Sequence, residues 1–151
     1  SMTYQIIYSS ASSTPMEQEA LDTLLAHAQR GNDQKGITGA LVYVDGFFLQ
    51  ILEGEREGVQ RLMQRIAGDV RHETVTILQE GDMSSAAFPD WKMAFVSATP
   101  QQVAEWAGLS AHTRLPDVWR DMREDRQMAT QVARRILSVL LSGQAGLDTN
   151  G

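Results

Sequence analysis

The chain has 151 residues, no cysteine and a formal net charge of −6 at neutral pH. This length fits one domain with a core of its own, and the missing cysteine excludes disulfides, thiolate metal sites and a cysteine nucleophile. An acidic chain argues against nucleic acid as a partner, because such binding requires neutralised phosphates. No apolar run approaches a membrane span and no signal peptide is visible, so we expect a cytoplasmic protein with no membrane contact.

The chain opens with a strand pattern followed by a helix pattern. Residues 3–9 predict a short apolar strand, and the segment 14–17, Thr-Pro-Met-Glu, is a capping box with proline at the first helical position. Apolar residues then recur at helical spacing from Met16 to Ala28. Gly31 predicts the end of this helix.

The next elements complete a sheet. Strands are predicted over 37–44 and 47–53, joined by Asp45-Gly46, a strong signal for a two-residue hairpin. A helix and two strands follow, over 55–68, 74–80 and 92–97. The order βαββαββ, with both helices on one face, predicts an α+β fold of the ferredoxin-like kind.

The two central strands are apolar on both sides, so the second sheet face also needs a cover. Helical patterns over 100–108 and 116–142 can provide it. We therefore expect a core over 2–98, a C-terminal helical cap of the same domain over 99–142, and a disordered tail over 143–151.

Gln50 stands out because it interrupts an apolar strand. A buried amide without partners costs about 1–3 kcal/mol, and glutamine offers a donor and an acceptor that exchange by rotation. On Gln50 alone, a half-buried residue that points to water is the simpler interpretation. Tyr8, however, lies on the first strand, which this topology places beside the third. Its hydroxyl can therefore donate to the Gln50 oxygen and leave the NH₂ group for a third partner.

Further residues accompany this pair in a fixed order. They are Tyr8, Asn32, Ile37-Thr38-Gly39-Ala40-Leu41, Gln50, Leu52-Glu53-Gly54, Asp69-Val70-Arg71-His72 and Phe88-Pro89-Asp90-Trp91-Lys92-Met93. In this order and at these separations, the set resembles the BLUF family of flavin-binding blue-light sensors. The resemblance covers roughly residues 2–97, and it is specific because the full ordered set is hard to reach by chance.

The resemblance implies a flavin, FAD or FMN, held non-covalently between the first two helices. The cofactor-binding residues that it implies are Tyr8, Leu24, Ala28, Asn32, Gln50, Asp69, Arg71 and His72. Arg71 and His72 would lie along the ribityl and phosphate tail, which favours FAD. Gly31 stands where some relatives have a larger side chain, which implies looser packing there.

The resemblance also implies a mechanism. An electron and then a proton leave Tyr8 for the excited flavin, and the Gln50 amide rotates or tautomerises so that the absorption shifts to the red. Trp91 and Met93, expected on one face of the fifth strand, would pass the signal to the C-terminal helices. Because no effector domain is seen after residue 98, we expect a homo-oligomer that acts on a separate effector protein.

Two alternatives remain open at this stage. One is a ferredoxin-like module for small-ligand binding or oligomerisation, without photochemistry, in which Tyr8, Asn32 and Gln50 hold a small polar ligand. The other is a flavin oxidoreductase, weakened because no substrate-side acid or base is evident. The histidines are widely separated, and Glu53 and Glu55 are expected in a solvated loop. We therefore expect neither a metal site nor an enzyme.

Overall fold

The computed structural model describes residues 2–12, 16–108, 114, 117 and 124–142. Its elements, in chain order, are β1 (Thr3–Ser12), α1 (Gln18–Lys35), β2 (Thr38–Val44), β3 (Phe47–Gly54), α2 (Arg56–Ala67), β4 (His72–Met83), β5 (Ala94–Ser97), α3 (Pro100–Trp106) and α5 (Arg126–Leu141). This order confirms the predicted α+β, ferredoxin-like arrangement.

The strands form one sheet in the order β4-β1-β3-β2-β5. Its pairs are antiparallel except for β2 with β5, which run parallel. Asp45 and Gly46 join β2 to β3 with positive φ angles of 44° and 85°, the turn geometry that favours a tight hairpin. The predicted hairpin is therefore confirmed, and it holds β2 against β3 at the centre of the sheet.

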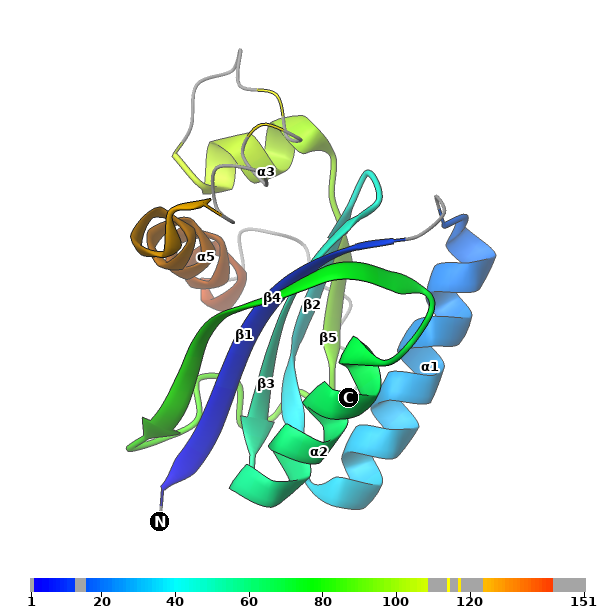
Figure 1. Cartoon of the computed structure of the whole chain (residues 1–151), viewed down its shortest axis with the longest axis vertical. Coiled ribbons are helices and arrows are strands. Elements are labelled where there is room, and N and C mark those ends of the chain that lie inside the picture. The colour runs from blue at the N-terminus through cyan, green and yellow to red at the C-terminus, as the bar shows by residue number, and fades with distance from the viewer. Residues whose placement is uncertain (1, 13–15, 109–113, 115–116, 118–123, 143–151) are drawn as a thin grey trace.

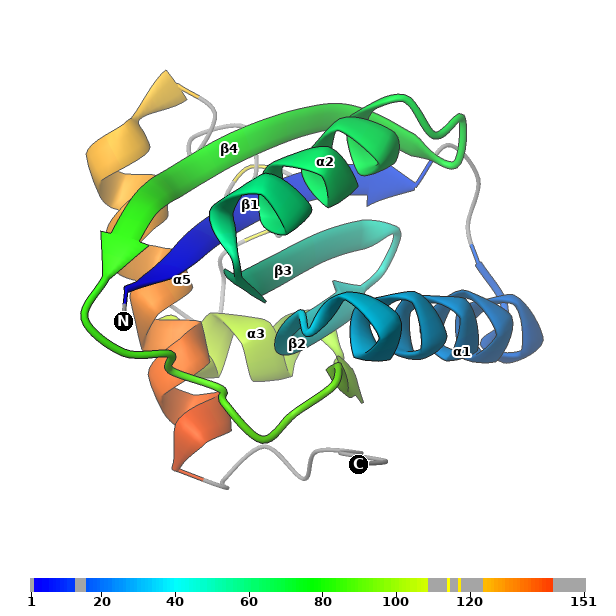
Figure 2. The same cartoon turned by 90° about the horizontal axis from the view of Figure 1, so that it is seen from below.

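Helices cover both faces of the sheet (Figures 1 and 2), and a hydrophobic core lies on each face. On one face, Leu21 and Leu25 of α1 and Val59 and Met63 of α2 pack against the strands. On the other face, α3 and α5 pack through a second set, which includes Val103, Ala107, Val132, Ile136 and Leu140. Full burial of each leucine, valine, isoleucine or methionine among them contributes about 1.5–3 kcal/mol. The C-terminal helices thus cover the second face, as predicted.

The first helix differs from its prediction at both ends. α1 begins at Gln18, so Met16 and Glu17 of the predicted capping box precede the helix, while residues 14 and 15 of that box lie outside the described part of the chain. It also continues through Gly31, because a glycine inside a helix costs only about 1 kcal/mol. The left-handed φ that ends a helix, +67°, belongs to Gly36 instead.

The last predicted helix is shorter in the structure. α5 begins at Arg126 because Asp125 is extended, with φ −125° and ψ 99°, and its carboxylate accepts a hydrogen bond from the Met128 N–H. This is the geometry of an N-cap residue. Residues 118–123 and the predicted disordered tail, 143–151, lie outside the described residues.

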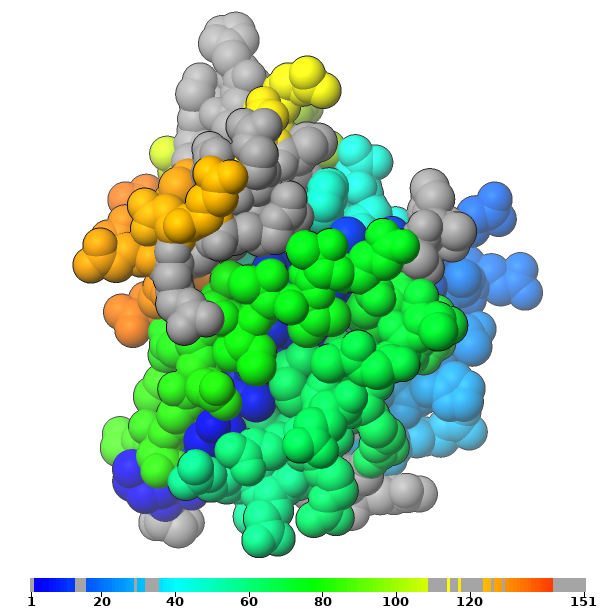
Figure 3. Space-filling model, in the orientation of Figure 1, coloured from blue at the N-terminus to red at the C-terminus, as the bar shows by residue number. Residues whose placement is uncertain are grey.

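The strand boundaries also move. β1 and β4 are longer than predicted, and β5 begins at Ala94, so Trp91 and Met93 lie in the connection before it. Glu53 was expected in a solvated loop, but it belongs to β3 and is buried. In the space-filling view, β4 and α2 make up much of the front surface (Figure 3). No helix within the described residues is long and apolar enough to cross a membrane.

Candidate functional site: a cavity beneath two helices

A cavity of about 420 Å³ lies between α1, α2 and the sheet. This volume falls within the usual range for small-molecule sites, roughly 300–1,000 Å³. Its lining residues are Tyr8, Leu24, His27, Ala28, Leu41, Phe48, Gln50, Leu62, Arg65, Ile66, Asp69, Arg71 and His72. The walls thus combine apolar side chains with a polar pair on the sheet, basic groups from the helices, and charged groups of both signs from the α2–β4 turn.

The polar pair on the sheet is Tyr8 with Gln50. The two residues are direct cross-strand partners of β1 and β3, and the Tyr8 hydroxyl donates a hydrogen bond to Gln50 Oε1. They are only 1% and 5% exposed, respectively. Burial raises the pKa of Tyr8 well above its usual value, and the negative charge of Asp69 raises it further. Tyr8 is therefore a protonated donor aimed at a buried amide.

The amide nitrogen of Gln50 faces a poor acceptor. Gln50 Nε2 donates to Met93 Sδ at 3.3 Å, and a thioether accepts hydrogen bonds weakly. Met93 is fully buried on the cavity face of the sheet. Trp91 instead packs on the opposite face, where its ring lies 4.8 Å from that of Phe88. The expectation that Trp91 and Met93 share a face is therefore wrong, because neither lies in the regular strand.

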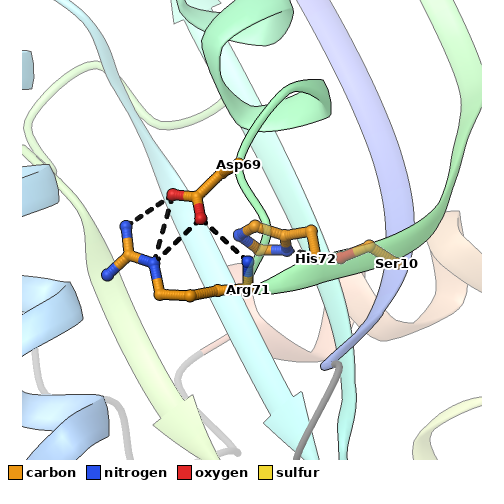
Figure 4. Close-up of polar contacts among 4 residues, drawn as sticks. All are labelled: Ser10, Asp69, Arg71 and His72. Atoms are coloured by element: carbon orange, nitrogen blue, oxygen red, sulfur yellow. Dashed lines mark hydrogen bonds and ion pairs between the residues drawn. The ribbon is translucent and has the colours of Figure 1, made fainter.

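Asp69 and Arg71 form an ion pair at the turn between α2 and β4 (Figure 4). The Arg71 guanidinium donates to both oxygens of Asp69 at 2.6–3.1 Å, and the Arg71 backbone N–H donates to the same carboxylate at 2.9 Å. These bonds lower the pKa of Asp69 to about 2. The pair fixes the turn and places a guanidinium beside the cavity.

His72 occupies the first position of β4, beside this ion pair. Its Nδ1 lies 2.9 Å from the buried Ser10 hydroxyl (Figure 4). Its ring lies 5.1 Å from that of Phe48. Burial lowers the pKa of His72, although Asp69 acts in the opposite direction. Ser10 thus orients an imidazole at the end of the cavity, where it can donate to a ligand through Nε2.

The sequence-predicted residues mostly converge on this cavity. Seven of them line it: Tyr8, Leu24, Ala28, Gln50, Asp69, Arg71 and His72. Asn32 lies within the last turns of α1, and its side chain is outside the described part of the chain. The sequence interpretation missed six lining residues: His27, Leu41, Phe48, Leu62, Arg65 and Ile66. The helical periodicity of α2 could have indicated Leu62 and Ile66, which share its apolar face.

The donors and walls fit a flavin. A planar heteroaromatic ring needs apolar walls on its faces and hydrogen-bonding groups at its edge. The buried Gln50 amide lines this cavity, and its NH₂ group has a weak acceptor, Met93 Sδ, among the described residues. Arg65 and Arg71 supply cations for a phosphate-bearing tail. Within the described residues, no group of three metal-ligating side chains offers a competing metal site.

Residues 3–94 match the family described as BLUF, sensors of blue-light using FAD. The chain belongs to the BLUF family. Members of this family are flavin-binding photosensors. The match ends at the start of β5, so α3 and α5 lie beyond the family's shared segment.

Known relatives agree with this assignment. The chain is 34% identical over 105 residues to the photoactivated adenylate cyclase subunit beta of Euglena gracilis, a match that covers 69% of this chain and 12% of the cyclase subunit. The chain therefore spans about an eighth of that relative's length.

Solved structures of BLUF proteins share the fold. The photo-activated state of BlsA is 26% identical with a TM-score of 0.67, and the match covers 89% of this chain and 94% of that one. The dark-state structure of BlrB, a BLUF protein, is 21% identical with a TM-score of 0.67, covering 90% and 96%. These matches extend past residue 94, so the helical cover also has counterparts.

Proposed function

We propose that this protein is a blue-light photoreceptor whose switch is the hydrogen bond between Tyr8 and Gln50. The observation that carries the proposal is a buried tyrosine–glutamine pair at the wall of a flavin-sized cavity. A bound flavin supplies absorption of blue light and an excited state that accepts an electron. The chain's own residues supply the donor, the rotatable amide and the surrounding walls.

Tyr8 acts as the electron and proton donor. Its hydroxyl is buried and protonated, so a proton can follow the electron and return along the bond to Gln50 Oε1. If the Gln50 amide turns by half a rotation, Oε1 faces Met93 and Nε2 faces Tyr8. The new arrangement offers a different atom to the cavity, and we expect a reversible red shift of the bound flavin as its readout.

The basic groups favour FAD over FMN. Arg65, Arg71, His27 and His72 all line the cavity, and a pyrophosphate offers more oxygen acceptors to these donors than a single phosphate does. Leu24 and Ala28 of α1 form the apolar wall against which the ring would pack. Asn32 would add an amide donor at the ring edge, as the family resemblance implies.

The signal would leave through the connection that carries Met93. Met93 contacts the Gln50 amide and directly precedes β5, which leads into α3. Residues 99–142 would then serve as the cap and output segment of the same domain as the core, 2–98. We propose that this segment contacts a second copy of the chain or a separate effector protein.

The first test is the colour and spectrum of the purified protein. It should be yellow, acid precipitation should release all the flavin as FAD, and blue light should shift the absorption reversibly to the red. A colourless protein that cannot be reconstituted with FAD would contradict the proposal. For output, hydrogen exchange in the dark and in the light should differ more in residues 92–97 and 126–141 than in α2.

A further inference from the structure

Glu53 is a fully buried carboxylate on the sheet face opposite the cavity. Only 1% of the residue is exposed, and no basic side chain of the described residues forms an ion pair with it. Its two oxygens accept three hydrogen bonds instead. Oε2 accepts from the Ala87 N–H at 2.8 Å and from Gln5 Nε2 at 3.1 Å, and Oε1 accepts from the Phe88 N–H at 2.7 Å. Such complete pairing is what a buried carboxylate requires.

The two backbone donors belong to the connection between β4 and β5, which carries Met93. Phe88 is buried against the ring of Trp91, and the Trp91 carbonyl accepts a hydrogen bond from the Gly39 N–H at 2.9 Å. Gly39 is required there, because a Cβ would lie 1.9 Å from the Ile51 carbonyl oxygen. The connection is thus fixed at two points, the Ala87 and Phe88 amides and the Trp91 carbonyl. Met93 follows two residues after Trp91.

The same carboxylate is also linked to α5. Gln5 Oε1 accepts from Gln79 Nε2 at 3.2 Å, and Gln79 Oε1 accepts from Arg134 of α5 at 3.4 Å. Oε2 of Glu53 accepts from both Gln5 and Ala87. If the β4–β5 connection moves, the hydrogen bond from Gln5 to Glu53 therefore changes, and this bond is the first of the series that leads through Gln79 to Arg134. Glu53 therefore joins the segment before β5 to the helix that covers the sheet.

We propose that Glu53 is a positioning residue of the photoswitch, which keeps Met93 against the Gln50 amide by holding the Ala87 and Phe88 amides. Glu53 and Gln50 lie on opposite faces of the same strand, β3, so the strand fixes the carboxylate relative to the photoactive amide. Because the β4–β5 connection is bound to Glu53, Met93 at its end lies in contact with Gln50 Nε2. This inference rests on the proposed function, since the photoswitch is what Glu53 tunes.

The test substitution is Glu53→Gln, which keeps the size of the side chain. It turns one acceptor oxygen into an NH₂ donor that faces another N–H donor. The matched control is Glu55→Gln, the same change at an exposed side chain that makes no capping hydrogen bond. Two quantities are measured on the full chain: amide exchange of Ala87 and Phe88 in the dark by NMR, and the lifetime of the red-shifted state.

We expect the Ala87 and Phe88 amides to exchange at least about tenfold faster in Glu53→Gln than in the control. The lifetime of the red-shifted state should change at least about threefold, because Met93 moves relative to Gln50. Faster exchange with an unchanged lifetime would overturn the positioning role. Unchanged exchange would show that Glu53 does not hold the Ala87 and Phe88 amides.

Failure of the proposed function is distinguishable from failure of the positioning role of Glu53. If neither the wild type nor Glu55→Gln shows a red shift, the proposed photoreceptor is wrong, whatever the exchange rates. If Glu53→Gln does not fold, Glu53→Asp takes its place, because it keeps the charge but retracts the carboxylate by one methylene. The same two measurements then apply, with the same expected and contradicting results.

Discussion

The Tyr8 hydroxyl donates its hydrogen bond to the side-chain oxygen of Gln50, its direct partner across β1 and β3. The direction of this bond matters, because it commits the glutamine oxygen and leaves Nε2 as a donor. That donor meets only the sulfur of Met93 among the contacts described for it. The oxygen of the Gln50 amide is therefore bound firmly by Tyr8, and its nitrogen is bound weakly by Met93. In such an arrangement a small change in free energy can reverse the orientation of the amide.

Gln50→Leu should remove the switch and keep the fold. Leucine has a similar volume and suits the apolar strand, so the protein should still bind flavin and lose stability by at most about 1–3 kcal/mol, from the unpaired Tyr8 hydroxyl. Blue light should then produce no red shift. The control is Gln101→Leu, which changes an exposed glutamine of α3. A full, reversible shift in Gln50→Leu would contradict the role of the amide.

Tyr8→Phe should stop the normal photocycle, because it deletes both the proposed electron donor and the partner of Gln50 Oε1. The matched control is Tyr4→Phe, on the same strand and face, whose hydroxyl donates to Glu80 at 2.7 Å. The control should lose about 1 kcal/mol of stability and keep the red shift. Transient absorption and steady-state spectra compare the two variants. If both lose the shift, Tyr8 has no special role.

Sequence patterns predicted the ferredoxin-like sheet and its helices because hydrophobic periodicity and the Asp45-Gly46 turn are local signals. They misplaced the end of α1, since Gly31 and Gly36 are both possible stops and only tertiary packing selects between them. They also placed Trp91 and Met93 on one face by assuming a regular strand, which the structure lacks at both positions. The partners of Glu53 are distant in sequence, so no local pattern could reveal its burial.

The ion pair of Asp69 with Arg71 should stabilise the protein in a defined acid window. The pKa of Asp69 falls from 3.8 to about 2 on folding. The stabilisation is therefore present above about pH 4, where the unfolded carboxyl is ionised, and it is lost as the pH falls towards 2. Because the side chains are 26% and 51% exposed, Asp69→Asn should cost less than about 1 kcal/mol at pH 6.

Urea denaturation of the wild type and Asp69→Asn over a pH series measures this window. The difference in the free energy of unfolding should shrink on acidification and vanish only below about pH 2. Glu57→Gln provides the control, since it breaks a solvent-exposed ion pair with Arg61 at 3.9 Å. It should stay within about 0.5 kcal/mol of the wild type at pH 6. A difference for Asp69→Asn that grows on acidification would show that the pKa moves the other way.

Met93, rather than Trp91, should control the lifetime of the red-shifted state. Met93→Leu keeps the apolar volume but removes the sulfur that accepts from Gln50 Nε2 at 3.3 Å. The loss weakens the dark arrangement by up to about 1 kcal/mol, so dark recovery should slow by up to about fivefold.

Trp91→Phe provides the control, because it changes a ring that packs on Phe88, on the far face of the sheet. It should leave the recovery rate within about twofold of the wild type. Both rates come from the decay of the red-shifted absorption after a blue pulse, and slower recovery in Trp91→Phe than in Met93→Leu would reverse the assignment.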